Sequence, residues 1–158
     1  MALELPPAPK VLAVLGSLLG RDVPLAPGDP AGDILTEGYS ALCLDDDGHP
    51  AAALSADLRA AAFLGGTLMM LPSGRLEDSV DAGELDEIVV DALSEVFNNL
   101  TVPFNAVPGN SHVASKPASA TTQLLGSDDG AWIANASKRL DLSGTVLGGA
   151  GHLVLWAR

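Results

Sequence analysis

Cysteine is nearly absent from this sequence of 158 residues, which contains only Cys43. A single cysteine excludes an intrachain disulfide and favours a reducing compartment. Aromatic residues make up only 4% of the chain, so the core must be built from Leu, Val, Ile and Ala. The apolar runs are too short to span a bilayer, and the start of the chain lacks the basic region of a secretory signal. We therefore expect a cytoplasmic protein without membrane insertion.

Basic residues are also scarce, because 8 Lys and Arg face 20 Asp and Glu, for a formal net charge of −12. The basic residues form no cluster, so nucleic acid and anionic membranes are not expected partners. A basic patch on another protein would be attracted. The alternative is that the charge only keeps the protein soluble.

Apolar residues make up 47% of the chain, which predicts one folded domain over residues 1–158. Hydrophobic spacing predicts helices over residues 10–19, 55–70 and 85–100, the second begun by Ser55. Two strands, 39–44 and 50–54, form a hairpin around Asp47 and Gly48. Residues 71–79 and 101–118 are expected to be a turn and a long loop, and 120–125, 131–136, 139–147 and 152–157 are expected to be strands. This order predicts an α+β fold, with an antiparallel or mixed sheet packed against long helices.

The most informative element is the amphipathic helix over residues 85–100. Its apolar residues recur at helical spacing and form one stripe: Leu85, Ile88, Val89, Ala92, Leu93, Val96 and Leu100. At roughly 100° per residue, the opposite side gathers five polar residues within about a quarter of the circumference. These are Glu87, Asp91, Ser94, Glu95 and Asn98. Asp81 and Glu84 match a capping box and predict where the helix begins.

Asp91, Glu95 and Asn98 occur at the spacing of a known signature, Asp or Ser, three residues, Glu, two residues, Asn. In this respect the helix resembles the signature helix of the CheC/CheX/FliY chemotaxis phosphatases. The preceding order of strand, helix and Gly/Met/Pro-rich turn also resembles CheX, and the single signature helix is similar to CheX rather than to CheC, which has two. The similarity is clearest over residues 37–100.

The resemblance implies that the chain removes phosphate from the phospho-aspartate of a CheY-like receiver domain. Asn98 would hold the attacking water, and Glu95 would bind the receiver's active-site lysine. Glu87, Asp91, Ser94 and the more peripheral Asn99 would contact the partner. Mg²⁺ would be bound by the receiver, and no cofactor is expected in this chain. A homodimer stays open, because the sequence does not set the oligomeric state.

Two departures from the family pattern concern prolines. The family helix usually continues past the Asn, whereas Pro103 predicts an end near Leu100. A proline about twenty residues after the Asn is typical, and Pro117 lies near that place but not at the usual spacing. The main alternative function is therefore a catalytically silent relative that only binds a receiver or a flagellar partner. The alternative of a plain solvated helix face needs no partner at all.

Other kinds of site have little support in the sequence. The three histidines lack the spacing of zinc ligands. Asp45, Asp46 and Asp47 lack the alternating ligands and the distal glutamate of a calcium loop, so an acidic hairpin tip is expected. Cys43 lies in an apolar strand and is expected in the core. No serine lies in a Gly-x-Ser-x-Gly elbow, and no small-molecule pocket can be named.

Overall fold

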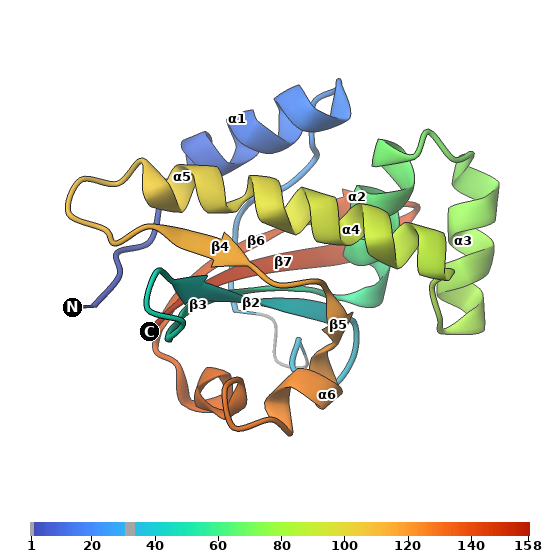
Figure 1. The fold of residues 1–158 in the computed structure, drawn as a ribbon. Coiled ribbons are helices and arrows are strands. Elements are labelled where there is room, and N and C mark those ends of the chain that lie inside the picture. The colour runs from blue at the N-terminus through green and yellow to red at the C-terminus, as the bar shows by residue number, and fades with distance from the viewer. Residues whose placement is uncertain (1, 31–33) are drawn as a thin grey trace.

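An antiparallel sheet runs through the middle of the computed structural model, which describes residues 2–30 and 34–158 (Figure 1). The strand order is β1-β6-β7-β3-β2-β4, and β5 also pairs with β2. The strands are β1 (Ala26–Pro27), β2 (Tyr39–Asp45), β3 (Pro50–Ala56), β4 (Val113–Ser115), β5 (Ser119–Ala120), β6 (Lys138–Val146) and β7 (Gly149–Ala157). The helices are α1 (Ala8–Leu19), α2 (Leu58–Leu68), α3 (Ser73–Ala82), α4 (Glu87–Asn99), α5 (Thr101–Asn105), α6 (Thr121–Leu125) and the 3-10 helix η1 (Ala131–Asn135). This confirms the predicted α+β fold.

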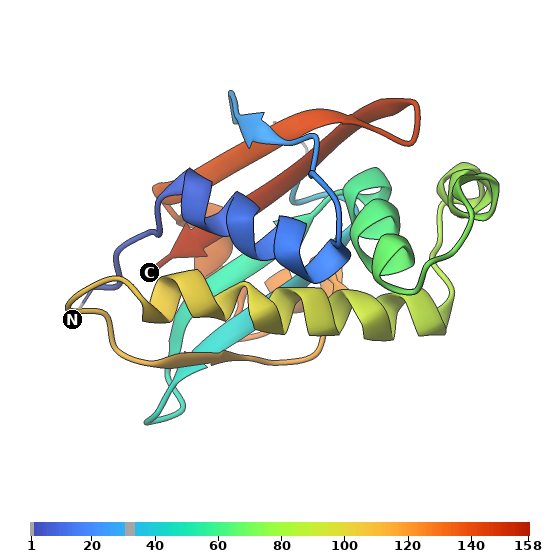
Figure 2. The ribbon, with the colours of Figure 1, turned by 90° about the horizontal axis from the view of Figure 1, so that it is seen from above.

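Each face of the sheet buries its own set of apolar side chains, because successive side chains of a strand point to opposite faces. Cys43, Leu54 and Leu155 belong to the larger core, under α1, α2, α4 and α5. Leu42 and Val154, their chain neighbours, belong to a smaller cluster with Ile34, Ala53, Ile133 and Trp156 on the other face. Figure 2 shows α1 lying beside α4 and α5 over the sheet. The exposed side of α4 therefore points away from the sheet.

Helix α4 lies on α2 at a point where α2 has no side chain. A Cβ atom added to Gly65 would lie 2.5 Å from the carbonyl oxygen of Val89 and 3.2 Å from the amide nitrogen of Leu93. Glycine is costly within a helix, but here it lets two helix backbones approach closely. Gly65 therefore favours packing of α2 against α4, and the adjacent Gly66 leaves room for the Leu76 side chain of α3, although both glycines weaken α2 as an isolated helix.

Ser55 is a strand residue and not the predicted N-cap of α2. Its buried hydroxyl lies 2.7 Å from the hydroxyl of Ser40 and accepts a hydrogen bond from the Trp156 indole at 3.0 Å. The N-cap is Asp57, whose Oδ1 accepts from the amide of Ala60 at 2.9 Å, while its Oδ2 lies 2.8 Å from Nδ1 of His152. The prediction erred by two residues because serine and aspartate both favour N-cap positions.

The start of the signature helix also differs from the prediction. Residues 71–79 were expected to be a turn, but most of them belong to α3, and Asp81 lies in the last turn of that helix. Gly83 ends α3 at φ +78°, and α4 begins only at Glu87. Asp86 precedes α4 and makes no side-chain capping bond, and its Oδ2 accepts from the guanidinium of Arg75 at 3.1 Å. The predicted capping box is therefore wrong.

Two short segments predicted to be strands are helical. Residues 120–125 form the end of β5 and all of α6, and residues 131–136 contain all of η1. Short apolar runs cannot be assigned to strand or helix by periodicity alone. Thr121, at the start of α6, is buried and bonds to Ser40 of β2 at 2.7 Å between the hydroxyl oxygens. This contact attaches α6 to the sheet, where a further strand was expected.

The remaining predicted elements are confirmed. Helix α1, the β2–β3 hairpin and strands β6 and β7 occur where the sequence places them. Gly48 has φ +81°, and its amide donates to the Asp45 carbonyl at 3.0 Å, which closes the hairpin turn. Among residues 2–30 and 34–158, no helix combines the length and apolar character needed to cross a bilayer.

The contact between α2 and α4 is testable by adding one methyl group. We expect Gly65→Ala to lower the free energy of unfolding by about 2 kcal/mol, because the new Cβ meets the backbone of α4. Urea denaturation measures the change. Gly74→Ala is the matched control in α3, where the added Cβ meets nothing within 4 Å. Its stability should be unchanged or raised by up to about 1 kcal/mol. Equal stabilities for the two variants would contradict this packing.

Candidate functional site

The inner side of α4 is a continuous part of the core. Val89, Ala92, Leu93, Val96 and Phe97 are all buried, as are the flanking Leu85 and Leu100. The predicted apolar stripe is therefore confirmed except at Ile88, whose side chain is exposed. Phe97 belongs to the buried side although the sequence pattern did not include it. Because this side is fixed by packing, the polar side has a defined direction.

Four polar residues of α4 are exposed together: Glu87, Asp91, Glu95 and Asn98. None of the residues of α4 is basic, so this face carries three carboxylates without a compensating charge of its own. Within the described part of the chain, the Asn98 carboxamide has no hydrogen-bonding partner, and its donors and acceptor are available to another molecule. The structure thus brings Glu95 and Asn98 to one surface of a rigid element.

Asn99 orients Glu95 from the next turn of the helix. Its Nδ2 donates to the Glu95 backbone carbonyl at 2.9 Å and to Oε1 of the Glu95 carboxylate at 3.3 Å. One carboxylate oxygen is therefore held within the helix, and Oε2 has no such bond. The sequence assigned Asn99 to the periphery of the site, and its half-buried side chain in fact contacts the glutamate of the signature directly.

Ser94 differs from the other polar residues of α4 because its hydroxyl is used inside the protein. It donates to the Val90 carbonyl at 3.1 Å and accepts from the amide of Ala118 at 2.9 Å. Ala118 follows Pro117 in the segment between β4 and β5. This bond attaches the edge of the sheet to α4, and it places the proline noted in the sequence next to the signature helix.

The end of α4 is only partly as predicted. The helix stops at Asn99, as Pro103 indicates, since proline cannot donate to the Asn99 carbonyl. The predicted long loop is wrong, however, because one residue later α5 begins and contains Pro103. Leu100 between them has right-handed helical angles, and Thr101 Oγ1 donates to the Asn98 carbonyl at 2.7 Å. The backbone therefore continues past Asn98 nearly along the axis of α4.

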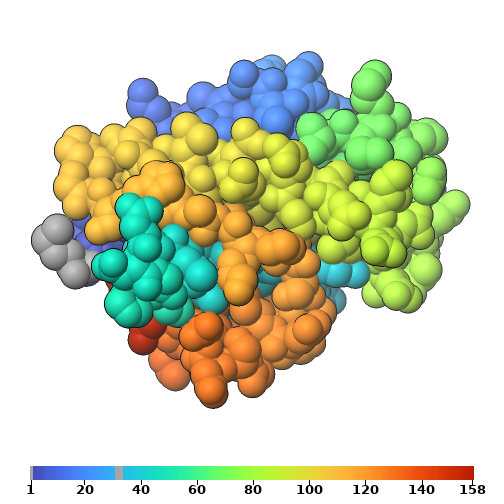
Figure 3. Space-filling view, viewed as in Figure 1, coloured from blue at the N-terminus to red at the C-terminus, as the bar shows by residue number. Residues whose placement is uncertain are grey.

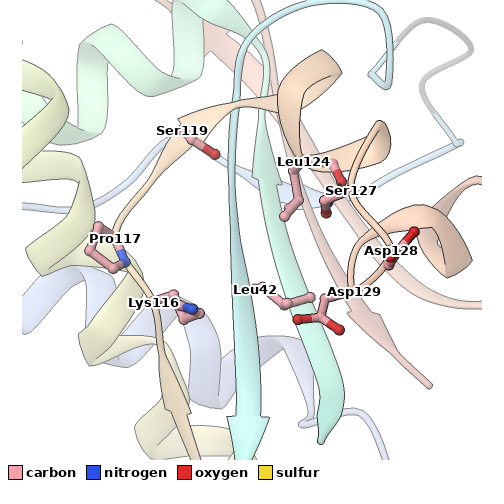
Figure 4. Close-up of a pocket in the computed structure, with 8 residues that line it drawn as sticks. All are labelled: Leu42, Lys116, Pro117, Ser119, Leu124, Ser127, Asp128 and Asp129. Atoms are coloured by element: carbon pink, nitrogen blue, oxygen red, sulfur yellow. Dashed lines mark hydrogen bonds between the residues drawn. The ribbon is translucent and has the colours of Figure 1, made fainter. Parts of the chain in front are cut away.

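A cavity of ≈ 400 Å³ lies at the edge of the sheet, next to the segment between β4 and β5. Lys116 and Pro117 form one wall, Asp128 and Asp129 the opposite wall, and Leu42 of β2 lies between them (Figure 4). The sequence gave no sign of it, because its walls come from segments far apart in the chain. Neither Glu95 nor Asn98 lines it.

Other candidate groups do not form a catalytic centre. Asp45, Asp47 and His49 lie together at the tip of the β2–β3 hairpin, where amides of the turn already donate to Asp45 Oδ1. Cys43 is buried in β2, as predicted. Burial raises the pKa of the Cys43 thiol to about 12, so the thiolate needed for nucleophilic attack is not formed near neutral pH.

No family model and no curated protein matches the sequence. The fold is nevertheless similar to solved structures. The FliM middle domain from H. pylori superposes with a TM-score of 0.65 and 12% identity, over 95% of this chain and 84% of that chain. The CheX-CheY-BeF3-Mg complex from Borrelia burgdorferi gives 0.55 and 16%, over 93% and 91%. FliY from Thermotoga maritima gives 0.55 and 14%, over 91% and 81%. The chain therefore has the fold shared by CheX, CheC-like, FliY and FliM proteins.

The bond between Ser94 and Ala118 is testable by hydrogen exchange. We expect Ser94→Ala to speed the exchange of the Ala118 amide and to lower the free energy of unfolding by about 1 kcal/mol, the typical contribution of one hydrogen bond. NMR exchange rates and urea denaturation measure the two effects. Ser17→Ala, at an exposed position of α1, is the control. An unchanged exchange rate for Ala118 would show that Ser94 does not hold this segment.

Proposed function

We propose that this chain accelerates the hydrolysis of the phospho-aspartate of a CheY-like receiver domain. The observation that carries the proposal is that Glu95 and Asn98 are both exposed on one side of α4, and that the Asn98 carboxamide has no hydrogen-bonding partner among residues 2–30 and 34–158. The fold supports it, because the CheX-CheY-BeF3-Mg complex contains a protein of similar fold together with CheY. A cytoplasmic location, inferred from the single cysteine, belongs to the same proposal.

The protein needs to contribute little covalent chemistry to this reaction. An acyl phosphate is already activated, and its transition state is loose, so the main need is a water in line with the phosphorus. The oxygen of the Asn98 carboxamide accepts a hydrogen bond from that water, and its NH₂ group donates to a phosphoryl oxygen. The water oxygen bonds to phosphorus as the bond to the aspartyl oxygen breaks. Inorganic phosphate leaves, and the aspartate carboxylate is restored.

Glu95 and its neighbours position the partner. The carboxylate of Glu95 accepts a charge-assisted hydrogen bond from the receiver's active-site lysine, which sets how the two proteins align. Asn99 is a positioning residue, because it holds Oε1 of Glu95 and leaves Oε2 for that lysine. Glu87 and Asp91 extend the acidic surface along α4, and Ser94 shapes its border. Mg²⁺ is bound by the receiver in this proposal.

A second candidate function is binding without catalysis. The observation that favours it is the superposition on the FliM middle domain, whose TM-score of 0.65 exceeds the 0.55 of the CheX-CheY complex. In this case the α4 surface would bind a receiver or a flagellar partner and leave its phosphate in place. The decisive experiment is phosphate release from each phosphorylated CheY-like receiver of the source organism, with and without this protein. Tight binding without faster release would favour the binding module.

Removing the carboxamide tests the catalytic assignment. We expect Asn98→Ala to slow the stimulated release of phosphate about 100-fold, because the water and the phosphoryl oxygen lose their common partner. Circular dichroism should be unchanged, since Asn98 is exposed and makes no internal side-chain bond. Asn135→Ala, which removes another exposed carboxamide in η1, is the control. Full turnover by a folded Asn98→Ala variant would end the assignment.

Reversing one charge tests the docking role of Glu95. We expect Glu95→Lys to raise the Kd for the phosphorylated receiver by at least about tenfold, because two positive charges then meet in the interface. Isothermal titration calorimetry measures the affinity. Asp129→Lys makes the same change of charge on the far side of the sheet and should have little effect. Equal affinities of wild type and Glu95→Lys would rule out the pairing with lysine.

A further inference from the structure

The surface around α4 has one sign of charge over a long stretch of chain. Residues 76–115 contain no Lys or Arg but eight Asp and Glu, all exposed: Glu77, Asp78, Asp81, Glu84, Asp86, Glu87, Asp91 and Glu95. In Figure 3 the green to yellow surface of α3, α4 and α5 faces the viewer as one continuous area. Arg75, which bonds to Asp86, lies at the border of this stretch. The surface is therefore suited to a cationic partner.

Two exposed apolar side chains lie on either side of Glu95 and Asn98 along the chain. Ile88 of α4 is 47% exposed, and Val102 of α5 is 54% exposed. Ile88 lies seven residues before Glu95, which is two helical turns, and Val102 lies four residues after Asn98. At 1.5 Å per residue the two are about 20 Å apart. Neither residue belongs to the buried core.

We propose that Ile88 and Val102 are the apolar anchors of a docking surface on α4 and α5 for the cationic face of a receiver domain. This proposal rests on the proposed function and adds the residues that determine affinity. The partner it predicts has a basic group between two apolar patches. Burial of the two apolar side chains contributes to the free energy of binding, whereas the polar pair between them supplies alignment and chemistry.

The charge of the surface decides between the occupants. A second copy of this chain, paired about a two-fold axis, would bring the same acidic residues against themselves. Like charges that face each other across an interface oppose binding. Nucleic acids and anionic membranes are repelled for the same reason. A protein surface that carries lysine or arginine gains from all three carboxylates of α4.

The two kinds of contact predict different kinetic effects. Ile88 and Val102 are buried to the same extent before the reaction and in its transition state. Loss of this contact therefore weakens binding of the receiver but does not slow phosphate hydrolysis within the bound complex. The carboxylates attract the partner over a distance, and salt screens this attraction. Affinity should therefore fall as ionic strength rises, while the contribution of the apolar anchors should change little.

Neutral polar substitutions test the anchors without altering charge. We expect Ile88→Gln and Val102→Gln each to raise the Kd for the phosphorylated receiver, formed with acetyl phosphate and Mg²⁺, by about tenfold. Phosphate release at saturating receiver should stay at the wild-type rate. Met70→Gln is the matched control, because Met70 is an exposed apolar residue in the turn between α2 and α3. Calorimetry gives Kd, and circular dichroism checks the fold of each variant.

The outcomes separate this proposal from the proposed function. If the Ile88→Gln and Val102→Gln variants bind the receiver as wild type does, and Asn98→Ala still slows phosphate release about 100-fold, the anchors are wrong and the phosphatase stands. A lower saturated rate with unchanged Kd would also overturn the anchors. If wild type binds without accelerating phosphate release, the catalytic function fails, and the Kd values still decide the anchors. Failure of wild type to bind or accelerate any receiver would overturn both. If wild type is a homodimer and the Gln variants are monomers, the anchors alone are overturned, because Ile88 and Val102 then belong to a contact between two copies.

Discussion

The close approach of α2 and α4 is the contact on which the site depends. It exists because Gly65 has no Cβ where the backbone of α4 passes. With this contact in place, the apolar side of α4 is held against α2 and the core, and its polar side is turned to solvent. A helix held less closely could rotate and would not keep Glu95 and Asn98 in one direction. Gly65, although it weakens α2 as an isolated helix, is thus part of what orients the site.

Local hydrogen bonds then refine a surface that packing has already oriented. Asn99 holds one oxygen of Glu95, and Ser94 holds Ala118 beside the helix. Both bonds come from polar residues that a helical projection places near the exposed side. On a helix, a polar residue at the border between core and solvent can serve either an outside partner or the protein itself. Which of the two applies depends on the neighbouring segment, which no pattern within α4 describes.

The sheet is stabilised differently on its two faces. The face under the long helices is filled mainly by aliphatic side chains, such as Leu54 and Leu155. The other face is covered by the short α6 and η1, and a chain of buried hydroxyls runs from Ser55 through Ser40 to Thr121. Hydroxyl groups can form hydrogen bonds with many partners, so the sequence alone does not show which hydroxyls pair. The second face was consequently the part of the fold that was predicted least well.

The periodic apolar pattern was sufficient to predict α1, the β2–β3 hairpin, the last two strands and α4. It also predicted that Glu95 and Asn98 of α4 are exposed. Burial of one side of each element depends on local spacing, which the sequence contains. Element boundaries around α3 and the helical state of residues 121–125 and 131–135 were decided by contacts between distant segments, such as Arg75 with Asp86 and Thr121 with Ser40. The same is true of the exposure of Ile88, the attachment of Ala118 to Ser94 and the continuation of the chain into α5. A local pattern records which side of an element is apolar, but only the packed protein determines which neighbours meet each residue.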